Sequence, residues 1–155
     1  MRERLSALSP SARTALVPVA ALAQPTMSLM RGDAAAAEGV AEAVQEGVLQ
    51  IDGERLRFAH PLLASFVYGD ASETERRAVH AQLVPLVADP EERALHLARG
   101  TSAPDESVAS TLETTADRAA KRGHPEIAAE LAEHAERLTP AHRRDDRGRR
   151  VRKAA

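Results

Sequence analysis

Six histidines are the residues of this 155-residue sequence best suited to chemistry, because imidazole can bind metals or move protons near neutral pH. Two of them follow a glutamate by four residues, which places each pair on one face of a predicted helix: Glu92 with His96, and Glu130 with His134. No His-Glu-x-x-His motif occurs, and a stable zinc site usually needs three or four protein ligands. We therefore expect surface interactions at these pairs, and no metal site.

Nucleophilic catalysis has no more support in the sequence. The chain has no cysteine, which excludes thiolate nucleophiles, disulfides and cysteine-based zinc sites. Ser65 and Ser107 lie outside any Gly-x-Ser-x-Gly motif, and no histidine–acid pair can be placed beside them from sequence. The Gly-x-x-x-x-Gly-Lys-Ser/Thr phosphate loop of ATPases is missing too. We expect no enzyme activity.

Positive charge gathers near the C-terminus. Overall, 21 basic and 23 acidic residues leave a formal net charge of −2, so the whole chain has no electrostatic attraction to nucleic acid or anionic membranes. The local exception is a cluster of seven cations: Arg143, Arg144, Arg147, Arg149, Arg150, Arg152 and Lys153. They could neutralise nucleic-acid phosphates, but no aromatic residue lies among them for base stacking, and Asp145-Asp146 interrupts them. We favour a solvated helix face and keep nucleic-acid contact as the alternative.

Nothing in the sequence predicts a membrane segment. No run of about 20 apolar residues occurs, and no apolar stretch that could serve as a signal peptide follows residues 1–4. We expect a cytoplasmic protein without membrane contacts.

Helix signals and one hairpin signal organise residues 1–70. Ser9-Pro10 predicts a helix start, with a kink at Pro18, and Asp33 begins a second helix that runs to about residue 46. Two short β-type runs, 48–51 and 56–58, are separated by Asp52-Gly53, a strong hairpin signal. His60-Pro61 then starts a helix with one apolar face: Leu62, Leu63, Phe66 and Val67. This order is typical of a winged-helix unit.

Residues 71–155 are predicted to form helices, with a linker at residues 101–104. One helix covers residues 73–87 with a late kink at Pro85, and another begins at Asp89-Pro90. Two apolar stripes, in residues 108–119 and 127–138, flank Gly123-His124-Pro125 and predict an αα-hairpin, after which Thr139-Pro140 begins a third helix. The pair has the length of one tetratricopeptide unit of about 34 residues. Such units need neighbours to bury their exposed faces.

The predicted fold is therefore mainly α. A winged-helix-like unit with one small β-hairpin covers residues 1–70, a helical connector covers 71–104, and tetratricopeptide-like helices of an incomplete repeat array cover 105–155. The helix before the hairpin, residues 33–46, contains four acidic residues and no basic one. Because DNA-reading helices need Arg or Lys, we expect this winged helix to be a packing module.

One segment carries most of a family resemblance: residues 56–63 read LRFAHPLL, with Val67-Tyr68 after them. It resembles a segment of the LuxR-type large ATP-binding transcriptional regulators, and so do residues 93–98, 116–123, 128–131 and 138–140. In these signal-transducing NTPases a nucleotide-binding domain is followed by a winged helix, helical repeats and a terminal DNA-binding helix-turn-helix. The resemblance covers roughly residues 5–155. It implies that the chain is the middle of such a regulator, with Met1 an assigned start inside a split or degraded gene.

The resemblance also implies a role for His60. In related NTPases a histidine at this place, within a Met-His-Asp motif, touches the β-phosphate of ADP. Ala59 and Pro61 flank it here, so only the histidine matches. We expect nucleotide sensing in an intact parent that binds ATP or ADP, no cofactor in this chain, protein partners, and only indirect contact with DNA. The alternatives are a local hydrogen bond at His60 and a free-standing helical adaptor that never contacts nucleotide.

Overall fold

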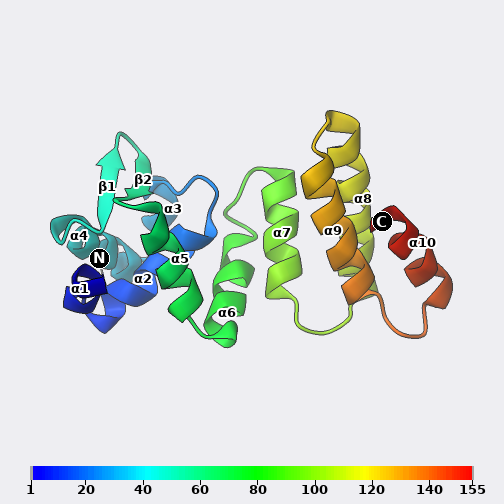
Figure 1. Ribbon diagram of the computed structural model, residues 1–155, viewed down its shortest axis with the longest axis horizontal. Coiled ribbons are helices and arrows are strands. Elements are labelled where there is room, and N and C mark those ends of the chain that lie inside the picture. The colour runs from blue at the N-terminus through cyan, green and yellow to red at the C-terminus, as the bar shows by residue number, and fades with distance from the viewer. Residues whose placement is uncertain (1, 155) are drawn as a thin grey trace. The chain divides into compact units, whose positions relative to one another are not determined.

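The computed structural model describes residues 2–154, and the side chains of residues 4–152. Its fold is mainly helical with one two-stranded antiparallel sheet, which confirms the fold class predicted from sequence (Figure 1). The described chain forms two compact units, one ending at Val79 and one beginning at His80. The three segments predicted from sequence, 1–70, 71–104 and 105–155, stay a prediction.

Within the described residues the first unit contains residues 73–79 of a sixth helix, together with five whole helices and the hairpin: α1 (Arg2–Ala7), α2 (Pro10–Ala21), α3 (Met27–Met30), α4 (Ala34–Gln45), β1 (Leu49–Asp52), β2 (Arg55–Phe58) and α5 (Pro61–Asp70). Both predicted caps are present. The Ser9 hydroxyl accepts a hydrogen bond from the Ala12 amide at the start of α2, and the Asp33 carboxylate accepts from the first amides of α4. Pro18 lies inside α2 without ending it.

Helices α2 and α4 pack closely. A Cβ atom added to Gly39 of α4 would lie 2.6 Å from the Cβ of Ala15 on α2, so only glycine fits this approach. At the start of α2, Glu42 of α4 accepts hydrogen bonds from the Ser9 amide at 2.6 Å and from the Ser9 hydroxyl at 2.7 Å. These bonds, the amide first, lower the pKa of Glu42. The contact buries Leu16 and Val40 completely.

The hairpin differs from its prediction by one residue. Asp52 pairs with Arg55, so the two turn residues are Gly53 and Glu54 rather than Asp52 and Gly53. Gly53 has φ +61°, and within residues 2–154 only glycines have positive φ, which fits a turn of type II′. Thr26 forms a further antiparallel bridge with Arg55. A short extended piece between α2 and α3 therefore lies beside the hairpin, joined to it by this single bridge.

The predicted apolar face of α5 is half correct. Leu63 and Val67 are buried, as expected, but Leu62 and Phe66 are exposed. Leu62 is one residue away from Leu63, so at 3.6 residues per turn the two point about 100° apart. The inward stripe is narrower than the run of apolar residues suggested.

The second unit is a row of helices. Its members are the end of α6 (Glu73–Leu83), then α7 (Pro90–Gly100), α8 (Glu106–Arg122), α9 (Pro125–Leu138) and α10 (Arg144–Ala154). Helix α6 ends at Leu83 and not at residue 87, because a residue before proline, here Val84, avoids the α conformation. As a result Leu86 is exposed rather than inward. Helix α10 begins four residues later than predicted from Thr139-Pro140.

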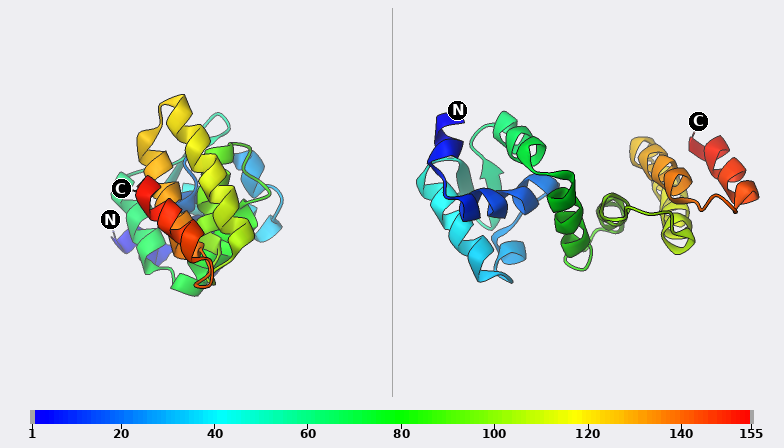
Figure 2. Two further views of the ribbon diagram at one scale, coloured as in Figure 1. Left: turned by 90° about the vertical axis from the view of Figure 1, so that its right-hand side faces the viewer. Right: turned by 90° about the horizontal axis from the view of Figure 1, so that it is seen from below.

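The αα-hairpin of α8 and α9 forms the centre of this unit (Figures 1 and 2). Gly123 ends α8 in the left-handed conformation, with φ +86°, and Pro125 begins α9, as predicted. Helix α7 contacts both helices of the hairpin, and α10 contacts α9. The buried core comprises Ala94, Ala98, Ala109, Leu112, Ala116, Leu131, Ala132, Ala135 and Leu138.

Candidate functional site

His60 lies at the start of α5, directly after the hairpin. Its ring Nδ1 accepts a hydrogen bond from the Leu62 amide at 3.2 Å and so caps the helix. A neutral ring that accepts at Nδ1 carries its proton on Nε2. The side chain is exposed. The capping bond therefore leaves an Nε2–H donor available at a helix N-terminus, where the partial positive charge favours anions.

The helix that precedes the hairpin, α4, is used for packing. Its sequence has no basic residue, and Glu42 is bonded to Ser9. Because α4 approaches α2 closely at Gly39, the face of α4 that contains Gly39 packs against the core. A groove-reading helix needs cations toward phosphates, so α4 lacks the chemistry of a DNA-recognition helix.

The arginine-rich helix α10 is tied to acidic residues of α8. Arg150 is only 2% exposed, and its guanidinium donates to Glu106, to Glu113 and to the Thr139 hydroxyl. The neighbouring Arg149 donates twice to Glu113, with both distances 3.0 Å. These two arginines are thus committed to carboxylates within the second unit.

The remaining cations of the cluster differ in their availability. Arg143 forms an ion pair with Asp146 at 3.1 Å, and Arg147 lies 3.7 Å from Glu136. Arg144 and Arg152 are exposed and form no ion pair with another described residue. Lys153 lies outside the residues whose side chains are described. Of the six cations whose side chains are described, two arginines thus stay available for a phosphate.

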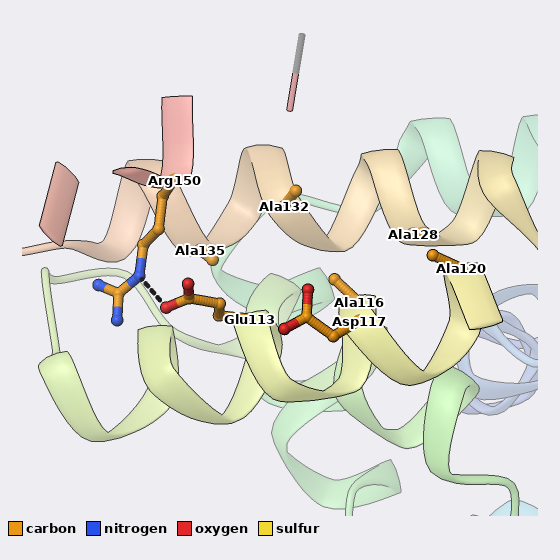
Figure 3. Close-up of a pocket in the computed structure, with 8 residues that line it drawn as sticks. All are labelled: Glu113, Ala116, Asp117, Ala120, Ala128, Ala132, Ala135 and Arg150. Atoms are coloured by element: carbon orange, nitrogen blue, oxygen red, sulfur yellow. Dashed lines mark hydrogen bonds and ion pairs between the residues drawn. The ribbon is translucent and has the colours of Figure 1, made fainter. Parts of the chain in front are cut away.

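A small cavity lies between α8 and α9, beside Arg150 of α10 (Figure 3). Its volume is about 130 Å³. Five alanines form most of its lining: Ala116, Ala120, Ala128, Ala132 and Ala135. Glu113 and Asp117 complete the lining, with Glu113 already bonded to Arg150. Pockets for drug-sized ligands measure roughly 300–1,000 Å³, so this cavity fits a gap between helices that carry small residues.

The two Glu–His pairs have different surroundings. In each pair the histidine Nε2 lies 3.7 Å from the glutamate Oε1, a distance too long for a hydrogen bond. The expectation of a surface interaction is wrong for His96, which is 1% exposed. Burial lowers the pKa of both His96 and His134. Among the described residues no group of three or more His, Cys, Asp or Glu could hold a metal ion.

Two contacts in the structure were not predicted from the sequence. His80 of α6 lies with its Nδ1 2.7 Å from the Nδ1 of His96 on α7, and both rings are buried. Glu91 is 4% exposed, and its carboxylate lies 2.7 Å from Nδ1 of His124, in the turn between α8 and α9. A signal existed for two of these residues, because His80 falls at helical spacing with the buried Leu83 and Val87, and Glu91 with the buried Ala94 and Ala98.

The chain matches no family model, and no curated protein or solved structure is significantly similar to it. Among the described residues, none of the helices combines the length and the apolar character needed to span a bilayer. The structure itself shows a first unit of helices and one hairpin, with a capping histidine, and a second, helical unit that contains an arginine-rich helix.

Proposed function

We propose that this chain is the regulatory middle segment of an ATP-dependent LuxR-type transcriptional regulator. In this role it performs no catalysis itself. It transmits the nucleotide state of a neighbouring ATP-binding domain through helix packing, and it contacts protein partners in the cytoplasm. DNA is contacted only by the terminal helix-turn-helix of the parent protein.

The observation that carries the proposal is the capping geometry of His60. The ring closes the hairpin, caps α5 through Nδ1 and presents Nε2–H beside a helix N-terminus. A phosphate oxygen needs a donor and a positive potential, and this place supplies both. The proposal assigns the β-phosphate of ADP, held by the neighbouring domain, to this donor.

The direct alternative, DNA binding by the winged helix itself, is disfavoured by charge. Helix α4 occupies the place of a recognition helix but has acidic and alanine residues. Phosphates facing it would be repelled. In contrast, a winged helix that packs against another domain needs no cations on this helix.

The test compares ADP retention in the intact regulator that contains this chain, with its upstream ATP-binding domain. His60→Asp keeps an oxygen acceptor for the cap and removes the Nε2–H donor, so the fold is expected to remain while ADP is lost faster. His142→Ala, which removes an exposed histidine elsewhere, serves as the matched control. Equal ADP retention by the wild type and His60→Asp would overturn the role of His60.

The genes beside this one offer a second check. An upstream reading frame with a phosphate-loop motif, or a downstream one with a helix-turn-helix, supports the regulator. Isolation on both sides contradicts it and favours a free-standing helical adaptor.

A further inference from the structure

Two buried histidines join α6 to α7 in the second unit. The Nδ1 atoms of His80 and His96 are 2.7 Å apart, their ring centroids are separated by 5.0 Å, and each residue is 1% exposed. A hydrogen bond between two ring nitrogens needs a proton on one and a lone pair on the other. The two neutral rings must therefore be opposite tautomers.

The surroundings of His96 select one of the two arrangements. Its Nε2 is buried, has no hydrogen-bond partner among the described residues, and lies 3.7 Å from the Glu92 carboxylate. A proton on this nitrogen is attracted by the carboxylate, whereas a lone pair would be repelled by it. We therefore assign Nε2–H to His96, with its Nδ1 accepting from Nδ1–H of His80.

The charges around the pair are largely neutralised by one another. On α7, Glu92 and Arg99 lie one turn from His96, and Glu130 of α9 holds Arg99 at 2.7 Å. Two further groups of α9 face this helix, His134 and Arg137, of which Arg137 donates to the Ala98 carbonyl. On α6, one turn before His80, Arg77 is paired with Glu73 and Arg76 lies over the ring of Tyr68. Of the acidic groups named in this paragraph, Glu92 is the one whose carboxylate lies beside His96, at 3.7 Å from its Nε2.

The contact leaves little room for adjustment. A Cβ atom added to Gly100 of α7 would lie 3.0 Å from the backbone nitrogen of Ala81, the residue after His80. The backbones of α6 and α7 are therefore already in van der Waals contact beside the two histidines. The helices are thus closely packed where the two rings meet, and we expect repulsion between the rings to weaken the contact of α6 with α7.

We propose that His80 and His96 form an acid-sensitive latch that fastens the end of α6 to α7. With one extra proton the pair keeps its hydrogen bond, because a charged His80 still donates to a neutral His96. With two extra protons, two N–H groups face each other at 2.7 Å and the latch opens. Regulation by protonation of this pair is independent of nucleotide sensing at His60.

The sign of the pH response follows from burial. Desolvation lowers the pKa of His96 in the folded state. Between this lowered pKa and the ordinary histidine pKa of about 6.5, the unfolded or opened state therefore binds more protons than the folded state does. Protection of the α6–α7 contact is therefore complete above about pH 6.5 and falls as the pH drops below it.

Hydrogen exchange of the full chain at pH 7.5, 6.5 and 5.5 tests the latch. The exchange rates are expressed as protection factors, which removes the intrinsic effect of pH on amide exchange. We expect protection of residues 80–83 and of α7 to fall at least tenfold between pH 7.5 and 5.5. His96→Gln removes the response, leaving protection within about twofold across this range. The matched control is His134→Gln on α9, which removes another partly buried histidine and leaves the acid response in place.

A nuclear magnetic resonance titration of the ring nitrogens in the wild type keeps the test independent of any variant. The expected result is Nδ1–H on His80 and Nε2–H on His96 at pH 7.5, with the two rings titrating in coupled steps. Independent titration of both rings at the ordinary pKa overturns the proposal, and so does an acid response of α7 that persists in His96→Gln.

Discussion

The guanidinium of Arg150 and the carboxylate of Glu106 form two parallel hydrogen bonds, with lengths of 3.0 Å and 2.8 Å. This fork joins α10 to the beginning of α8, forty-four residues earlier in the chain. Helix α10 has one larger apolar residue among its described side chains, Val151, and that residue is 43% exposed. The helix is therefore attached mainly by ion pairs and hydrogen bonds, and little by apolar burial.

The first prediction concerns salt. Exposed ion pairs such as Arg149–Glu113 are screened at high ionic strength, because the Debye length falls from about 10 Å at 0.1 M to about 3 Å at 1 M. We expect amide protection in α10 to fall when NaCl is raised from 0.05 to about 1 M, while α8 and α9 keep theirs. Hydrogen exchange at the two salt concentrations measures this. Equal protection of α10 in both would mean that apolar contacts hold it.

The second prediction concerns acid and the same fork. The hydrogen bonds from Arg150 hold the pKa of Glu106 below its ordinary value. The folded state therefore binds fewer protons than the unfolded one, so the contribution of Glu106 is complete above about pH 4.5 and is lost as the pH falls through the folded pKa. Unfolding by urea at pH 7 and pH 4 should show a smaller pH dependence in Glu106→Gln. Glu73→Gln, at an exposed pair on α6, is the control and should behave as the wild type.

Removing the arginine should be more harmful than removing the acid. Arg150→Met replaces a buried guanidinium by an apolar chain and leaves Glu106 and the Thr139 hydroxyl without this donor. We expect a loss of about 1–3 kcal/mol in the free energy of unfolding, since Glu106 keeps part of its hydration. Chemical denaturation at neutral pH measures it. Arg152→Met, at an exposed position on the same helix, should change stability by less than about 0.5 kcal/mol.

The fourth prediction uses two helical glycines with opposite surroundings. Gly39→Ala brings a methyl group within 2.6 Å of the Ala15 side chain, so overpacking should cost about 1–3 kcal/mol in spite of the better helix propensity of alanine. Gly148→Ala in α10 meets only the end of the Arg152 side chain, at 3.8 Å, and should stabilise the helix or leave it unchanged. Thermal unfolding of both variants decides, and a stable Gly39→Ala would contradict the packing of α2 on α4.

The fifth prediction concerns a buried carboxylate. Glu91 accepts from Arg122 at 3.4 Å and lies 2.7 Å from the His124 ring, so it ties the start of α7 to the turn after α8. Glu91→Ala leaves both partners without it and opens a gap, for which we expect a loss of about 1–3 kcal/mol in the free energy of unfolding. Glu133→Ala at an exposed site of α9 is the control. A loss of similar size in both variants would show that Glu91 acts only through general charge.

Local signals account for most of what could be predicted from sequence. Caps and turn residues act only on their near neighbours in the chain. In the structure four residues cap the start of a helix, namely Ser9, Asp33, Asp89 and Asp105, and Gly123 caps the end of one. The first three and Gly123 were predicted. The prediction was less accurate at the end of α6, where the helix ends before Pro85 and not at residue 87.

The parts that could not be predicted depend on long-range contacts. The bridge from Thr26 to Arg55 joins segments twenty-nine residues apart, and nothing in either residue indicates it. The contact between His80 and His96 likewise depends on how two helices approach, which periodicity does not report. For the arginine cluster, the sequence shows the positive charge but not the carboxylates that pair with it. Glu106 and Glu113 lie on α8, and the whole of α9 separates them from the cluster along the chain.

The order of contacts along the chain has a consequence for how the molecule folds. In the second unit α7 packs chiefly on α8, α8 on α9 and α10 on α9, so structure can spread from the α8–α9 hairpin one helix at a time, and α10 can detach alone. The first unit instead needs α2 to meet α5 across some forty intervening residues, which must be brought together at once. The two halves should thus gain their structure at different speeds, the later half of the chain ahead of the earlier one.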